Sequence, residues 1–171
     1  MSVQVVWESS SAGDTAALGA GLAGILGPGD LVIVRGDLGT GKTTLVRAVA
    51  RALGITEHVT SPTFALAQRY AGTVALLHID AYRLRGADDE ELGLLLDGAA
   101  DALTIIEWPE HLGAELGVPR VVVELTHSGG DQRLVALSSE MRDTHARLVD
   151  IVADLRARHI HAESQPGDHP G

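Results

Sequence analysis

The strongest chemical signal in the sequence is the stretch GDLGTGKT at residues 36–43. It matches the pattern G-x-x-x-x-G-K-[ST], in which backbone N–H groups, a lysine and a hydroxyl converge on phosphate groups. Lys42 is the only lysine of the chain, and its compact ammonium suits the β- and γ-phosphates of a nucleotide. Thr43 offers a hydroxyl to Mg²⁺. We predict a phosphate-binding loop whose cofactor-binding residues are Gly36, Gly39, Thr40, Gly41, Lys42, Thr43 and Thr44.

Two carboxylates follow short apolar runs and are candidates for metal binding and catalysis beside this loop. Asp80 follows residues 75–79, and Glu107 follows residues 103–106. A phosphate-bound Mg²⁺ needs an acid at the carboxyl edge of a neighbouring strand. Either acid could hold the metal, directly or through water, while the other orients the attacking water. Spacing leaves that choice open, so we predict both as metal and catalytic residues, with Lys42 as the third catalytic residue.

Two further segments contribute candidates for nucleotide binding. Pro62 disfavours helical backbone at Ser61, so an extended loop could carry the hydroxyl of Thr63 to the γ-phosphate or the metal. An ordinary turn is the competing interpretation of this segment. For the nucleotide base, the candidates are residues 10–15 and the loop that ends at Arg133, and we predict Arg133 as a cofactor-binding residue.

The elements that must position these residues indicate an α/β fold. Residues 31–34 form a continuous apolar run, which is typical of a strand covered on both faces in a parallel sheet. Residues 42–53 have helical periodicity, so the loop lies between a strand and a helix N-terminus, where phosphates bind. Residues 65–79 and 120–137 predict two antiparallel hairpins. We predict a P-loop NTPase-like sheet, mainly parallel with antiparallel hairpin strands, flanked by helices.

The 171 residues are near the size of one ordinary domain. We assign residues 1–138 to a P-loop ATPase domain and residues 139–158 to a C-terminal helix packed on it. The acids that precede leucines in residues 88–96 predict one more helix. Residues 159–171 have no periodic apolar pattern and contain two prolines, so we predict a disordered tail.

Composition excludes several classes of function. The net charge of −10 repels phosphate backbones and anionic membranes, so we do not expect a freestanding nucleic-acid binder. The chain has no cysteine, which removes thiol catalysis, thiolate zinc sites and disulfides. Its longest weakly polar stretch, residues 16–27, is too short to span a bilayer, and its first residues do not have the pattern of a signal peptide. We therefore expect a cytoplasmic protein without membrane contact.

Four motifs in order resemble one known family: GDLGTGKTT at 36–44, SPTF at 61–64, HIDAYRL at 78–84 and IEWPE at 106–110. They resemble the TsaE (YjeE) ATPases of bacterial tRNA threonylcarbamoyladenosine biosynthesis, over roughly residues 1–138. Ala81 stands where the family usually has leucine in Asp-Leu-Tyr-Arg-Leu, a departure that concerns packing rather than chemistry.

The resemblance implies a function, its cofactors and its partners. The cofactors are ATP and Mg²⁺, with Lys42 on phosphate, Thr43 and Glu107 on Mg²⁺, Asp80 as a further site acid and Thr63 in a switch-like loop. The family works with the TsaB–TsaD pair, which modifies adenosine 37 of tRNAs that read codons starting with A. The acidic charge agrees with indirect contact to tRNA, through these partners.

Three other functions compete with this interpretation. A small-molecule kinase would use the same loop and Mg²⁺ acids, but we find no lid-like insertion with clustered arginines. A regulatory GTPase would read guanine with Asn-Lys-x-Asp, which a chain with one lysine, already in the loop, cannot contain. A nucleotide-sensing adaptor would bind ATP without hydrolysing it, even with its partners present.

Overall fold

The protein folds into one sheet with helices against it, in a computed structural model that describes residues 4–62, 66–83, 90, 93–94, 96–112 and 116–163. The described elements, in chain order, are β1 (Gln4–Ser9), α1 (Ala12–Ala23), β2 (Leu31–Arg35), α2 (Lys42–Ala52), β3 (Ala67–Tyr70), β4 (Ala75–Asp80), β5 (Ala102–Glu107), β6 (Val121–Gly129), β7 (Gln132–Ser138) and α4 (Arg142–Glu163). Short 3-10 turns lie at Ala81–Arg83, Ala99–Asp101 and Pro109–His111.

The sheet has a parallel centre and antiparallel edges. Its seven described strands lie in the order β1-β7-β6-β2-β5-β4-β3. Strand β2 pairs in parallel with β5 and β6, and β5 pairs in parallel with β4. The hairpins β3–β4 and β6–β7 are antiparallel, and β1 extends β7. The predicted α/β class, with its parallel core and its two hairpins, is therefore confirmed.

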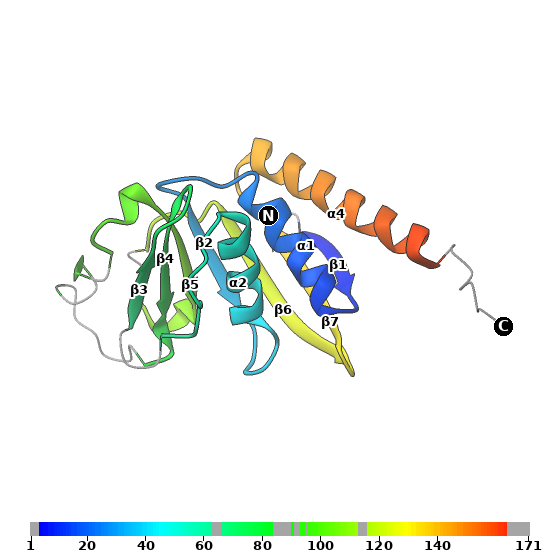
Figure 1. Ribbon diagram of the computed structural model, residues 1–171, viewed down its shortest axis with the longest axis horizontal. Coiled ribbons are helices and arrows are strands. Elements are labelled where there is room, and N and C mark those ends of the chain that lie inside the picture. Colours follow the sequence, from blue (N-terminus) through cyan, green and yellow to red (C-terminus); the bar gives the residue numbers. More distant parts are fainter. Residues whose placement is uncertain are drawn as a thin grey trace.

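The three α-helices that the structure describes cover one face of this sheet. Figure 1 shows α1 and α2 side by side over the strands, and α4 beside α1 at the β1 end. In α4, Leu148, Val152 and Leu155 are buried in the same apolar cluster as strand residues such as Val34 and Leu103, and Ile151 is partly buried against it. A methyl group on Gly19 of α1 would overlap the backbone of Ala48 in α2, at 2.8 Å from its carbonyl carbon, so glycine allows these two helices to approach closely.

The structure moves several predicted boundaries. Helix α1 is capped by Ser11, whose side chain accepts a hydrogen bond from the backbone N–H of Asp14, and it ends at Ala23, before the Gly-Pro-Gly sequence at residues 27–29. Helix α4 continues beyond the predicted end at residue 158, to Glu163. Residues 164–171, and most of the helix predicted over residues 88–96, lie outside the described part of the chain. Among the described helices, none combines the length and the apolar character needed to cross a bilayer.

Candidate nucleotide-binding site

The phosphate loop joins the end of β2 to the start of α2, at the carboxyl edge of the parallel strands. Gly36, Gly39 and Gly41 have φ angles of 144°, 80° and 99°, a region that side-chain-bearing residues seldom adopt. A methyl group on Gly36 would also overlap the carbonyl oxygen of Leu125 and lie 2.7 Å from Oγ1 of Thr40. The backbone of the loop therefore requires the glycines of the sequence motif.

Lys42 lies inside the loop rather than in solvent. Its side-chain nitrogen donates hydrogen bonds to the backbone oxygens of Gly36 at 2.7 Å and Asp37 at 2.8 Å. The same nitrogen lies 4.2 Å from the ring centre of Trp108, a cation–π contact. Burial lowers the pKa of the Lys42 ammonium, while the carboxylates of the site, Glu107 first among them, act in the opposite direction. A cation is therefore already in place where the phosphate groups of a nucleotide would lie.

Thr43 and Glu107 form the contact that links the loop to the neighbouring strand. Glu107 is the last residue of β5 and is 2% exposed. The Thr43 hydroxyl donates to Oε1 of Glu107 at 3.2 Å, and Nε2 of His78 lies 2.9 Å from the same oxygen. Trp108, the next residue, has φ 58° and ψ 51°, a strained backbone for a bulky residue. The end of β5 thus places a buried carboxylate, and directly after it an aromatic ring, next to the loop.

Asp80 is opposite Glu107 in the parallel pairing of β4 with β5. The hydroxyl of Ser61 donates to its Oδ2, and the backbone N–H of Tyr82 donates to its Oδ1 at 3.1 Å. Asp80 therefore links the segment before residue 63 to the 3-10 turn that follows β4. Of the two acids, Glu107 is the one that accepts a hydrogen bond from the loop threonine.

The oxygen atoms of this half of the site fit Mg²⁺. Thr43, Ser61, Asp80 and Glu107 line one hollow with the phosphate loop, and hydroxyl and carboxylate oxygens are hard donors that suit this ion. The described residues contain no group of three or more His, Cys, Asp or Glu side chains that could hold a metal by themselves. Mg²⁺ is usually held by one or two carboxylates together with water and substrate phosphates. We call this hollow the metal half.

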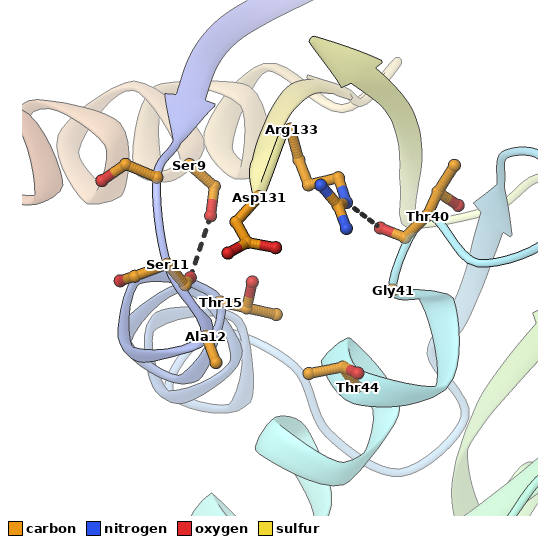
Figure 2. A pocket seen from close by; sticks show the side chains of 10 residues that line it. Ser9, Ser11, Ala12, Thr15, Thr40, Gly41, Thr44, Asp131 and Arg133 are labelled. Atoms are coloured by element: carbon orange, nitrogen blue, oxygen red, sulfur yellow. Dashed lines mark hydrogen bonds between the residues drawn. The ribbon is translucent and has the colours of Figure 1, made fainter. Parts of the chain in front are cut away.

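A second hollow lies on the other side of the loop (Figure 2). Its side chains come from the start of α1, from α2 and from the β6–β7 hairpin, with Thr15, Thr44, Asp131 and Arg133 around the opening. Arg133 donates through Nε to the backbone oxygen of Thr40 at 3.2 Å. This hollow, the outer half, is where the two candidate segments for base contact meet.

The structure brings together the predicted site residues that it describes. The two hollows are lined by Gly39, Thr40, Gly41, Lys42, Thr43, Thr44, Asp80, Glu107 and Arg133. Gly36 lines neither hollow and instead accepts a hydrogen bond from Lys42 through its backbone oxygen. Thr63 lies outside the described residues. The prediction missed His78 and Ser61 as partners of the acids. Alternation along β4 could have found His78, because residues two apart in a strand share a face.

A glycine-rich loop between a parallel strand and a helix, with acids at the ends of the next two strands, defines a P-loop nucleotide-binding protein. The family model described as "Threonylcarbamoyl adenosine biosynthesis protein TsaE" matches residues 9–135. The TsaE protein of Streptomyces coelicolor is 42% identical over 118 residues, 67% of this chain and 80% of that protein. The chain therefore belongs to the TsaE family.

Two further matches, one of sequence and one of structure, come from Bacillus subtilis. The TsaE protein, named for tRNA threonylcarbamoyladenosine biosynthesis, is 32% identical over 137 residues, 80% of this chain and 86% of that protein. The crystal structure of YdiB superposes with a TM-score of 0.73 at 26% identity, covering 93% of this chain and 97% of that one. The similarity thus extends over the whole fold and is not confined to the loop.

Proposed function

We propose that this protein is a cytoplasmic Mg²⁺-dependent ATPase required for threonylcarbamoylation of adenosine 37 in tRNAs that read codons starting with A. It acts with the TsaB–TsaD pair and contacts tRNA only indirectly, through these partners. The observation that carries the ATPase is the hydrogen bond from Thr43 of the phosphate loop to Glu107 at the end of the neighbouring strand. Membership of the TsaE family supports the assignment to tRNA modification.

In this proposal the loop binds the phosphates of ATP. The N–H groups at the start of α2 and the positive end of its dipole favour anions. Lys42 exchanges the backbone oxygens of Gly36 and Asp37 for the β- and γ-phosphates, so its buried charge keeps a partner throughout. Thr40 and Thr44 flank it, and Arg133 closes the outer half, where the base binds.

Thr43, Glu107 and Asp80 would hold Mg²⁺ together with the phosphates. The ion supplies Lewis-acid stabilisation of the charge on the transferring phosphoryl group. Glu107 accepts the Thr43 hydrogen bond and so orients the threonine oxygen toward the phosphates. Asp80, linked to Ser61 and Tyr82, couples the metal half to the segment that leads to Thr63. We propose that Thr63 belongs to a loop that responds to the γ-phosphate.

The acidic charge of the chain supports the proposal that the partners, rather than this protein, bind the tRNA. A protein with net charge −10 disfavours direct tRNA binding. We propose that residues 1–138 form the ATPase domain and that helix α4, which replaces the helix expected over residues 139–158, packs on it. We also propose that ATP hydrolysis is weak alone and stimulated by the TsaB–TsaD pair.

Steady-state ATP hydrolysis with Mg²⁺, alone and with purified TsaB–TsaD and tRNA, tests the proposal. We expect stimulation by the pair, and we expect Lys42→Ala to abolish it. Arg51→Ala is the matched control, because it removes one positive charge from the exposed last turn of the same helix. This control should behave as wild type.

Two outcomes would reject parts of the proposal. Hydrolysis that the pair leaves unchanged would leave a general P-loop nucleotidase, and small hydroxyl compounds would then be screened as kinase substrates. Tight, salt-sensitive tRNA binding by the isolated chain in electrophoresis would contradict indirect contact.

A further inference from the structure

His78 is a completely buried polar side chain beside the metal half. It lies on β4 with 0% of its surface exposed. In the pairing of β4 with β5, His78 is opposite Ile105 and Asp80 is opposite Glu107. Since alternate residues of a strand share a face, His78, Asp80 and Glu107 point to the same side of the sheet, where α2 lies. The imidazole is therefore the buried neighbour of both acids.

One oxygen of Glu107 receives two hydrogen bonds. Oε1 lies 2.9 Å from Nε2 of His78 and accepts from the Thr43 hydroxyl at 3.2 Å. An ionised carboxylate can only accept, so Nε2 is the donor in the first bond. We infer that His78 is a positioning residue, which fixes the Glu107 carboxylate against Thr43 so that Mg²⁺ binds to a preformed site. This inference rests on the proposed Mg²⁺-ATP function.

Packing alone gives no reason for a histidine at this place. Its face of the sheet is lined by apolar residues such as Leu76, Leu103 and Ile105. The other ring nitrogen, Nδ1, is buried without a hydrogen-bond partner among the described residues. Burying an unpaired polar atom is unfavourable, and leucine would avoid that cost. The contact that leucine would lose is the bond to Glu107.

That bond matters because glutamate has a long, rotatable side chain. Without the imidazole, only the Thr43 hydroxyl would hold the carboxylate among the described contacts, and Thr43 itself must turn its oxygen to the metal. Partners that orient metal ligands typically change metal affinity or activity by about 10–100-fold when they are removed. We expect a change of that size in the affinity for Mg²⁺ and no change in the affinity for the nucleotide when Mg²⁺ is absent.

The experiment measures binding of a fluorescent ATP analogue to the full chain, in EDTA and in a Mg²⁺ titration. His78→Leu should leave the affinity in EDTA unchanged and raise the half-saturating Mg²⁺ concentration about tenfold or more. His78→Gln should restore most of the Mg²⁺ response, because its amide nitrogen reaches the position of Nε2. His78→Asn should fail to do so, because its amide lies nearer the position of Nδ1.

Thr104→Val is the control for a general loss of stability. Thr104 is a buried polar residue of β5 whose hydroxyl has no partner among the described residues, and it does not line the metal half. It should bind Mg²⁺ and nucleotide as wild type does. Melting temperatures of all variants separate a folding defect from a metal-specific one.

The results distinguish this inference from the proposed function. If His78→Leu binds Mg²⁺ as wild type does, or if His78→Gln is as impaired as His78→Leu, the positioning role is wrong. A wild-type chain whose ATP-analogue binding ignores Mg²⁺ would instead overturn the proposed Mg²⁺-ATP site.

Discussion

The two halves of the site are built differently. The metal half consists of side chains at the ends of β4 and β5, joined by the bonds of Glu107 to Thr43 and His78 and of Asp80 to Ser61. The outer half consists of a helix start and a hairpin turn, where Arg133 donates to backbone oxygens. A half made of buried strand ends is fixed by its side chains, whereas a half made of turns depends on the course of the backbone. Substitutions in the metal half should therefore change the affinity for Mg²⁺. Substitutions in the outer half should change only the affinity for the nucleotide.

Glu107→Gln should have the largest effect. It removes the negative charge that faces Thr43 while keeping the size of the side chain, so we expect partner-stimulated hydrolysis to fall about a hundredfold or more. Binding of nucleotide in EDTA should remain. Glu124→Gln is the control, because Glu124 is an acid of neighbouring β6 that pairs with Arg35 away from the hollow. Equal losses in both variants would contradict a dedicated role for Glu107.

Gly36→Ala should disturb both halves at once, because the loop is their common wall. The new methyl group would collide with the Leu125 carbonyl, and φ is 144° there. We expect a loss of about 1–3 kcal/mol in the free energy of unfolding, measured by denaturant titration, together with loss of nucleotide binding. Gly27→Ala, with open space around the added methyl group, is the control. Normal nucleotide binding by Gly36→Ala would show that the loop can bind phosphate with a different backbone conformation.

Arg133→Ala should affect only the outer half. We expect nucleotide affinity, measured by calorimetry, to weaken roughly tenfold, equivalent to about 1.4 kcal/mol, through loss of a charged hydrogen-bond donor at Thr40. The half-saturating Mg²⁺ concentration should stay the same. Arg35→Ala removes an arginine from the exposed pair with Glu124 and serves as the control. A changed Mg²⁺ response in Arg133→Ala would mean that the two halves are coupled.

The smallest effect is expected far from both halves, at Asp143 in the first turn of α4. Hydrogen bonding to the backbone N–H of Thr144 and the nearby Arg120 hold the pKa of this carboxyl below its usual value of 3.8. The folded state therefore favours the ionised form, a contribution that is complete above pH 3.8 and is lost as the pH falls through the lower folded pKa. Asp143→Asn should lower the melting temperature slightly at neutral pH. It should leave the melting temperature unchanged at a pH below the folded-state pKa of Asp143. A constant difference at every pH would assign the effect to helix capping instead.

The metal half could be predicted from the sequence because its residues follow simple rules. The motif places Lys42 and Thr43, and an acid directly after an apolar run falls at the carboxyl edge of a parallel sheet. Sequence spacing did not separate Glu107 from Asp80, because the difference lies in which carboxylate reaches Thr43 across the strands. His78 was missed because its role depends on the register of β4 with β5.

The sequence named both segments of the outer half as candidates, residues 10–15 and the loop that ends at Arg133, but did not predict that they meet. These segments are far apart in the chain, and no pattern states that the start of α1 meets the β6–β7 turn. The pairing of β1 with β7 brings them together, with Ser9 opposite Arg133. The length of α4 was also underestimated, since a polar helix end lacks the apolar period that marks its earlier turns.

The position of Lys42 above Trp108 also has a spectroscopic consequence. Because the chain contains a single lysine, isotopic labelling of that amino acid gives one set of side-chain resonances, all from the phosphate loop. The indole ring, 4.2 Å from the ammonium, shifts the adjacent methylene protons to high field by its ring current. A ligand that draws the ammonium onto its phosphates relieves that shift, so one resonance reports occupancy of the loop without any substitution.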